Sequence, residues 1–113
     1  MTDRLFVYGT LQPGESMNHL LGSIGGVWNK GTIRGELIQA GEIPGFPYPG
    51  VILNDKGDTV PGYLFTSENL SAHWEKLDQY EGSSYKRVMT NVSLPDGRTV
   101  KSYIYELKAD TIK

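Results

Sequence analysis

The sequence predicts an α+β fold, a small mixed β-barrel or curled sheet with two to three short helices. Short apolar runs bounded by glycine and proline predict strands, and one amphipathic stretch between two pairs of runs predicts a helix. The 113 residues suffice for one hydrophobic core, so we expect a single domain over residues 1–113. Curling a short sheet into a barrel would remove its exposed edges.

The N-terminal part is expected to run from strand to loop to short helix. The strand is the apolar run at residues 5–8, which stops at Gly9. Residues 9–16 are rich in turn-forming residues and predict a loop. A short helix is predicted around residues 17–21 and ends at Gly22.

A second strand is predicted over residues 32–39, where Gly35 indicates that another group approaches the backbone closely. The segment that follows, residues 41–50, contains three glycines and three prolines, which excludes a helix or a central strand. We expect an ordered loop there, with Phe46 and Tyr48 as aromatic anchors.

Two hairpins are predicted in the rest of the chain. The first joins residues 51–53 to residues 60–65 through a turn rich in Asn, Asp and Gly. The second joins residues 85–94 to residues 99–107 through a Pro-Asp-Gly turn. Between them lies the clearest helix, predicted over residues 68–81.

Capping residues support the bounds of this helix. Ser67 or Asn69 can cap its start, the acidic Glu68 suits its first turn, and Gly82 ends it. Leu70, Trp74 and Leu77 then form an inward stripe of apolar side chains at positions i, i+4 and i+7.

Glu81 continues this stripe at position i+11, where about 100° per residue places it within roughly 20° of Leu70. Burial and the negative end of the helix dipole would both raise the pKa of its carboxyl group. A pKa near neutrality suits a group that must accept and then return a proton. Two alternatives remain open: Glu81 pairs with a base such as Arg87, or it extends past the helix end into water. Asp78 is interpreted as a flanking, partly exposed carboxylate.

Composition excludes several classes of function. The net charge is −2 and the eleven basic residues are scattered, which argues against nucleic acid and anionic membranes as partners. No cysteine is present, so disulfides, thiol nucleophiles and cysteine metal sites are excluded. Only two histidines remain, too few for a zinc site. The start of the chain lacks the apolar run of a signal peptide, and we expect a cytoplasmic protein.

The loop at residues 9–16 has the glycine spacing of a phosphate-binding P-loop, but Glu15 stands where the lysine should be and would repel a phosphate. Backbone N–H groups in this loop could instead receive a carboxylate or a carbonyl oxygen. An ordinary strand-to-helix turn explains the pattern equally well.

Tyrosines are unusually frequent, seven against three phenylalanines. We place Tyr85 and Arg87 on one strand face, and Tyr103, Tyr105 and Leu107 on another. Tyr85 and Tyr105 are the phenols that we assign to a substrate site, where they could orient a small polar molecule. Core packing with satisfied hydroxyl groups is the alternative for each.

Three segments together resemble the gamma-glutamylcyclotransferase-like family, of the gamma-glutamylamine cyclotransferase type. They are Phe6-Val7-Tyr8-Gly9-Thr10-Leu11, Leu77-Asp78-x-Tyr80-Glu81-Gly82 and Tyr85-x-Arg87. The resemblance covers about residues 4–107. It implies a compact mixed barrel with the substrate in a cavity at one end.

The resemblance also implies roles for individual residues. Tyr8, Gly9, Thr10 and Leu11 are expected to bind the γ-glutamyl part of a small-molecule substrate, largely through backbone groups, and Glu81 is expected to accept a proton. No metal or cofactor is implied. Many relatives carry a basic residue where this chain has Gln12, which leaves the choice of substrate open. The residues at 41–50 are expected to shape the pocket for the leaving amine.

The expected activity is conversion of a small γ-glutamyl amide to 5-oxoproline and a free amine, with Glu81 as general acid and base. Two alternatives keep the same cavity: a member that binds a small molecule without reaction, and a different transformation of a small amide. A third alternative is an interaction domain in which Trp28, Phe46 and Tyr48 form a surface patch.

Overall fold

The computed structural model describes residues 2–9, 13–15, 18–39, 41–44 and 48–108. These residues form six strands and three short helices, one of them a 3-10 helix, η1. In chain order they are β1 (Asp3–Val7), α1 (His19–Gly22), β2 (Val27–Ile38), β3 (Gly50–Leu53), β4 (Asp58–Ser67), η1 (Leu70–Ala72), α2 (Trp74–Glu81), β5 (Tyr85–Ser93) and β6 (Thr99–Leu107).

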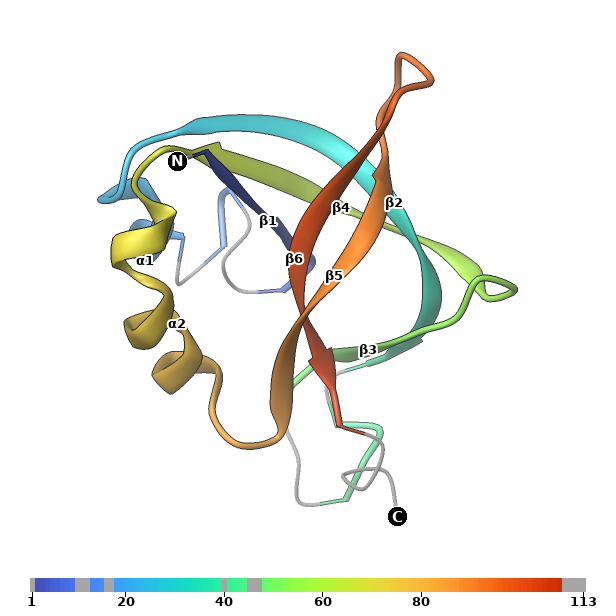
Figure 1. Cartoon of the computed structure of the whole chain (residues 1–113). Coiled ribbons are helices and arrows are strands. Elements are labelled where there is room, and N and C mark those ends of the chain that lie inside the picture. Colours follow the sequence, from blue (N-terminus) through green and yellow to red (C-terminus); the bar gives the residue numbers. More distant parts are fainter. Residues whose placement is uncertain (1, 10–12, 16–17, 40, 45–47, 109–113) are drawn as a thin grey trace.

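The strands form a closed barrel of five strands with one extra strand (Figure 1). Their order is β3-β2-β4-β1-β6-β5, and β5 pairs back onto β2 where Ser93 lies opposite Thr32. β1 and β6 run parallel, whereas the other pairs are antiparallel. The predicted α+β fold with a small mixed barrel is therefore confirmed.

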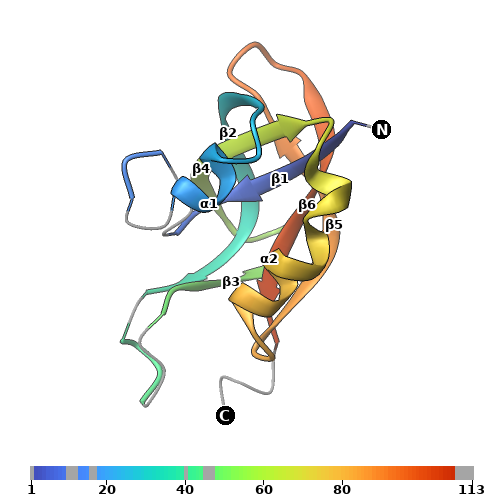
Figure 2. The same cartoon turned by 90° about the vertical axis from the view of Figure 1, so that its left-hand side faces the viewer.

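Alternation along the strands separates two hydrophobic clusters, because successive side chains point to opposite faces. The buried residues of the barrel interior come from strands: Phe6, Ile33, Val51, Val60, Leu64, Val92 and Ile104. The other cluster joins the outer face to the helices and contains Leu5, Val7, Leu21, Ile24, Phe65, Leu70, Leu77 and Tyr105. Figure 2 shows that α1 and α2 lie in front of the barrel on this side.

The first predicted hairpin is wrong in its pairing. The turn itself forms, with the Gly57 N–H donating to the Asn54 carbonyl at 2.8 Å. However, β3 and β4 both pair with β2, and Gly35 lies opposite Leu53 in one register and opposite Asp58 in the other. Residues 54–57 therefore form a loop between two strands that share β2 as their partner. The residue types of the turn do not show that β2 is long enough to pair with both.

The close approach expected at Gly35 is confirmed. A Cβ atom there would lie 2.6 Å from the Ile52 carbonyl oxygen, so a side chain cannot be accommodated without a backbone shift. β2 also begins five residues earlier than predicted, at Val27. Of its first six residues only Gly31 is buried, and this half is held by pairing with β4 rather than by an alternating apolar pattern.

The predicted helix over residues 68–81 is divided in two. His73, with φ −120° and ψ 0°, lies between η1 and α2, and it bonds back to Leu70 with the short spacing of a 3-10 turn. Ser67 accepts the Asn69 N–H at 3.0 Å ahead of η1, but His73, the N-cap residue of α2, makes no capping hydrogen bond with its side chain to a described residue. Gly82, at φ 85°, ends α2 as predicted.

The second hairpin, β5–β6, is confirmed, but the assignment of its side chains to two different faces is wrong. Tyr85 lies opposite Leu107, and Arg87 lies opposite Tyr105. Directly opposed residues project to the same face of a sheet. Tyrosines and Arg87 from both strands therefore meet on the face that α2 covers.

Two further predictions concern the short helix and the Pro/Gly segment. The helix expected at 17–21 corresponds to α1, and residue 17 lies outside the described residues. Tyr48, one of the two expected aromatic anchors, is 59% exposed, while Phe46 lies outside the described residues. Of the helices that the structure describes, none is long and apolar enough to cross a membrane.

Candidate active site

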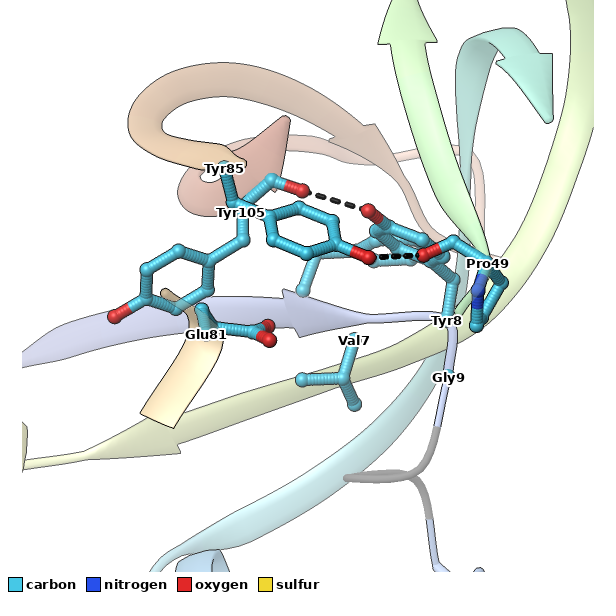
Figure 3. Close-up of a pocket in the computed structure, with 8 residues that line it drawn as sticks. Val7, Tyr8, Gly9, Pro49, Glu81, Tyr85 and Tyr105 are labelled. Atoms are coloured by element: carbon cyan, nitrogen blue, oxygen red, sulfur yellow. Dashed lines mark hydrogen bonds between the residues drawn. The ribbon is translucent and has the colours of Figure 1, made fainter. Parts of the chain in front are cut away.

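A small cavity of about 50 Å³ opens where β1 ends, between the C-terminus of α2 and the β5–β6 hairpin (Figure 3). It is lined by Phe6, Val7, Tyr8, Gly9, Pro49, Glu81, Tyr85 and Tyr105. This volume holds a few water molecules, so it suits the polar head of a small molecule rather than a whole drug-sized ligand.

Glu81 is the last residue of α2, and the apolar stripe of the helix directs it inward. Leu77, one turn earlier, is 3% exposed and packs in the helix-facing cluster together with Leu70. Figure 3 shows the Glu81 carboxyl group turned into the cavity, below the rings of Tyr85 and Tyr105. Packing of the apolar face of α2 thus fixes the position of Glu81. Gly82, with its positive φ angle, lets the chain leave the helix directly after Glu81.

Burial raises the pKa of Glu81 to about 7, because removal from water penalises the charged form. Within the described part of the chain, no basic side chain forms an ion pair with it. Arg87 does not pair with it as the alternative interpretation held, since its Nη1 lies 3.6 Å from Asp78 Oδ1. Near neutral pH this carboxyl group is therefore present in both protonation states.

The hydroxyl groups of the three tyrosines around Glu81 all donate hydrogen bonds to other protein groups. Tyr8 donates to the Tyr105 carbonyl at 2.6 Å, and Tyr85 donates to the Pro49 carbonyl at 2.5 Å. Tyr105 donates to Asp78 Oδ1 at 2.7 Å. Burial raises the pKa of all three phenols, and the charge of Glu81 raises each further. They remain neutral and act as fixed wall groups.

The structure brings together five of the seven residues that the sequence assigned to the site: Tyr8, Gly9, Glu81, Tyr85 and Tyr105. Thr10 and Leu11 lie outside the described residues. The hydroxyl of Tyr105 is directed away from the Glu81 carboxyl group in Figure 3, so this residue offers its ring to the cavity. The substrate-binding and catalytic roles of the five remain predictions.

Sequence reasoning did not single out Phe6, Val7 or Pro49 as lining residues. Phe6 and Val7 precede the predicted loop, and their sequence pattern indicates only an ordinary strand. The sequence did give an indication for Pro49, because it belongs to the Pro/Gly segment at residues 41–50 that was expected to shape the pocket. Its carbonyl fixes the Tyr85 ring across the cavity, and its ring lies 3.4 Å from the position of a Cβ atom at Gly9.

The polar groups of the cavity are suited to a ligand that donates hydrogen bonds. Its lining includes the Glu81 carboxyl group and the tyrosines Tyr8, Tyr85 and Tyr105, whereas no Lys or Arg is among the described residues that line it. Among the residues that the structure describes, no three His, Asp or Glu side chains come together as possible metal ligands. A neutral amine or amide N–H is the kind of group that this arrangement can receive.

The chain matches a family model described as "Gamma-glutamyl cyclotransferase, AIG2-like" over residues 5–113. It is 31% identical over 90 residues to a Bacillus subtilis (strain 168) protein named "Putative gamma-glutamylcyclotransferase YkqA", covering 79% of this chain and 30% of that protein. The chain thus spans about a third of the length of this relative.

Solved structures agree with the family match. The crystal structure of YkqA superposes with a TM-score of 0.73 at 29% identity, over 96% of this chain and 36% of that chain. An AIG2-like protein from Mus musculus gives a TM-score of 0.72 at 26% identity, over 96% of this chain and 78% of that one. Sequence motifs, barrel topology and these matches together show that the chain belongs to the AIG2-like gamma-glutamyl cyclotransferase family.

Proposed function

We propose that this protein is a gamma-glutamyl cyclotransferase that converts a small γ-glutamyl amide to 5-oxoproline and a free amine, with Glu81 as general acid and base. One observation carries the proposal: the Glu81 carboxyl group faces a small cavity without a basic partner among the described residues, and its pKa is raised to about 7. Family membership supports the reaction class. Because the chain spans only part of YkqA, the activity suggested by that name enters here as a proposal.

The reaction starts from a substrate that carries its own nucleophile. The neutral α-amine attacks the γ-carbonyl carbon, a new C–N bond closes the five-membered ring, and the carbonyl π electrons move onto oxygen. Glu81 as carboxylate takes one proton from the attacking nitrogen. When the tetrahedral intermediate collapses, the bond to the leaving nitrogen breaks and Glu81 returns the proton to that nitrogen. The carboxylate is thereby restored and no co-reactant is consumed.

Two effects would supply most of the rate. Holding the substrate in the ring-closing conformation can lower the barrier by roughly 7–11 kcal/mol, because the attack is intramolecular. General acid–base catalysis by Glu81 would contribute about 10²–10⁴-fold. Backbone N–H groups of the loop that starts at Gly9 are proposed to stabilise the oxyanion, which is typically worth about 3 kcal/mol per donor.

The test is formation of 5-oxoproline from a panel of γ-glutamyl amides. We expect Glu81→Gln, which is nearly isosteric, to lower kcat by about 10²–10⁴-fold because it can neither accept nor return the proton. Glu75→Gln is the matched control, since Glu75 lies on the exposed side of the same helix. It should keep wild-type turnover.

A substrate analogue sharpens the assignment. A glutaryl amide lacks only the α-amine, so it should bind but release no amine. Release of amine from that analogue would indicate direct hydrolysis, a different reaction in the same cavity. Wild-type turnover in the Glu81→Gln variant would remove Glu81 from the mechanism.

A further inference from the structure

A polar cluster lies directly behind the Tyr105 wall of the cavity. Asp78 Oδ1 accepts the Tyr105 hydroxyl at 2.7 Å and lies 3.6 Å from Arg87 Nη1. Asp78 is one turn before Glu81 on α2, and Arg87 lies opposite Tyr105 in the β5–β6 ladder. Asp78 thus contacts both the Arg87 guanidinium group and the hydroxyl group of Tyr105, the residue that forms this wall of the cavity.

Arg87 is fixed in this position by aromatic rings. Its guanidinium carbon lies 4.4 Å from the Trp74 ring centroid and 5.3 Å from that of Tyr103. The two rings pack edge to face at 5.0 Å. Its Nη1 is buried without a hydrogen bond among the described residues, so the Asp78 charge is what balances it. Removing that charge would leave the buried Nη1 without a compensating charge, although the Arg87 side chain as a whole is 26% exposed.

The charges of Arg87 and Glu81 both act on Tyr105: the former lowers the pKa of the Tyr105 phenol and the latter raises it. Arg87 and Glu81 therefore share Tyr105 as a neighbour, yet Glu81 has neither the Arg87 guanidinium group nor the Tyr105 hydroxyl group as a partner. Asp78 pairs with the former and accepts a hydrogen bond from the latter.

We propose that Asp78 is a positioning residue: it retains Arg87 and the Tyr105 hydroxyl behind the Tyr105 ring, so that Glu81 faces the cavity without a cation or a hydroxyl donor. This inference rests on the proposed function of Glu81 as an acid and base. A carboxylate paired with an arginine would stay ionised at neutral pH and could not return a proton to the leaving nitrogen.

The other described titratable groups that line the cavity with Glu81 are three phenols: Tyr8 from the end of β1, Tyr85 from β5 and Tyr105 from β6. Tyr80, on α2, acts electrostatically on Tyr85. Burial raises the pKa of Tyr8, Tyr85 and Tyr105, so these three phenols stay neutral near pH 7. We therefore expect a change in the charge of Arg87 or Asp78 to move the ionisation of Glu81.

The experiment measures the Glu81 titration midpoint by ¹³C NMR on Glu-labelled protein, with Glu81→Gln used to assign the resonance. Asp78→Asn retains an oxygen that accepts the Tyr105 hydroxyl but removes the charge, so Arg87 is no longer balanced. We expect the midpoint to fall by roughly half to one pH unit. The acid limb of the kcat/KM profile for 5-oxoproline formation should move by the same amount.

Matched variants separate positioning from general destabilisation. Asp78→Asn combined with Arg87→Met should return the midpoint close to wild type, because both charges are gone. Arg87→Lys retains the charge and should behave nearly as wild type. Asp55→Asn, in the exposed turn after β3, should change nothing. An unchanged midpoint in folded Asp78→Asn, or an equal fall in the double variant, would overturn the proposal.

The two proposals can fail separately. If the wild type forms no 5-oxoproline while the midpoints shift as described, the proposed function fails and the role of Asp78 stands. If turnover depends on Glu81 but the midpoints do not respond to Asp78 and Arg87, the function stands and the positioning role is wrong.

Discussion

The two faces of the barrel sheet differ sharply in chemistry although the same strands build both. The interior cluster consists of aliphatic side chains and Phe6, with Val51, Val92 and Ile104 fully buried. The helix-facing side combines leucines with tryptophan, tyrosines, Arg87, Asp78 and Glu81. On β6, Ile104 belongs to the first side and its neighbour Tyr105 to the second.

This difference indicates a division of labour between stability and chemistry. The aliphatic interior stabilises the fold through burial and close packing. None of the buried residues in this cluster titrates near neutral pH. The helix-facing side contains a poorly solvated acid beside aromatic rings, and a separate ion pair between Arg87 and Asp78. Substitutions on the two sides should therefore change different observables.

The largest effect on stability is expected inside the barrel. Ile104→Ala should lower the free energy of unfolding by about 2–5 kcal/mol, because it leaves a cavity at a fully buried position. Urea denaturation measures this loss. The Glu81 titration midpoint of the folded variant should stay at the wild-type value.

Ile104→Val provides the graded control, with an expected loss of about 0.5–1.5 kcal/mol. A shift of the Glu81 midpoint in either variant would show that the two sides of the sheet are coupled, against the division described above.

On the helix-facing side, the effect on stability should depend on pH. The pKa of Glu81 rises from 4.5 in the unfolded chain to about 7 in the fold. Between these values the folded protein binds the extra proton, so this group makes stability fall as pH rises from 4.5 to about 7. Below pH 4.5 it is neutral in both states and has no effect.

Glu81→Gln removes this dependence. Compared with wild type, the variant should gain stability at pH 8, by at most about 3 kcal/mol since residual water contact reduces the effect, and gain little at pH 4.5. Thermal or urea unfolding at the two pH values checks it. Equal differences at both pH values would contradict a raised pKa.

A smaller effect is expected at Tyr85. Tyr85→Phe removes the hydrogen bond to the Pro49 carbonyl and should lower the free energy of unfolding by about 1 kcal/mol. KM should rise more than kcat falls, because the ring loses its fixed orientation while the proposed acid and base remains.

Tyr63→Phe is the comparison variant. The Tyr63 hydroxyl makes no hydrogen bond within the described residues, and Tyr63 does not line the Glu81 cavity. If both tyrosine variants had the same KM, the Tyr85–Pro49 bond would have no part in shaping the site.

Periodic patterns in the sequence predicted the parts of the fold that depend on one face being buried. The stripe of Leu70, Trp74 and Leu77 indicated that Glu81 turns inward, and alternation together with turn chemistry gave the β5–β6 hairpin. The residue motifs then supplied the family resemblance, which the family match confirms.

Features that depend on distant pairing were missed. The turn at residues 54–57 has hairpin chemistry, yet β2 is long enough to pair with both flanking strands, and local sequence does not report a shared partner. Asp78 was correctly interpreted as a flanking, partly exposed carboxylate, since its side chain is 45% exposed. Its partners were missed because they come from β5 and β6. The hydrogen bond from Tyr85 to the Pro49 carbonyl, 36 positions away, was likewise not visible in the local sequence.

The proposed role of Glu81 depends most on its ionisation in the folded protein. A ¹³C NMR titration of its carboxyl carbon between pH 3 and 10 measures this directly. We expect a midpoint near 7, well above the 4.5 of an unperturbed glutamate. A midpoint at 4.5 would mean that water or a cation stabilises the carboxylate, which contradicts the proposed acid and base.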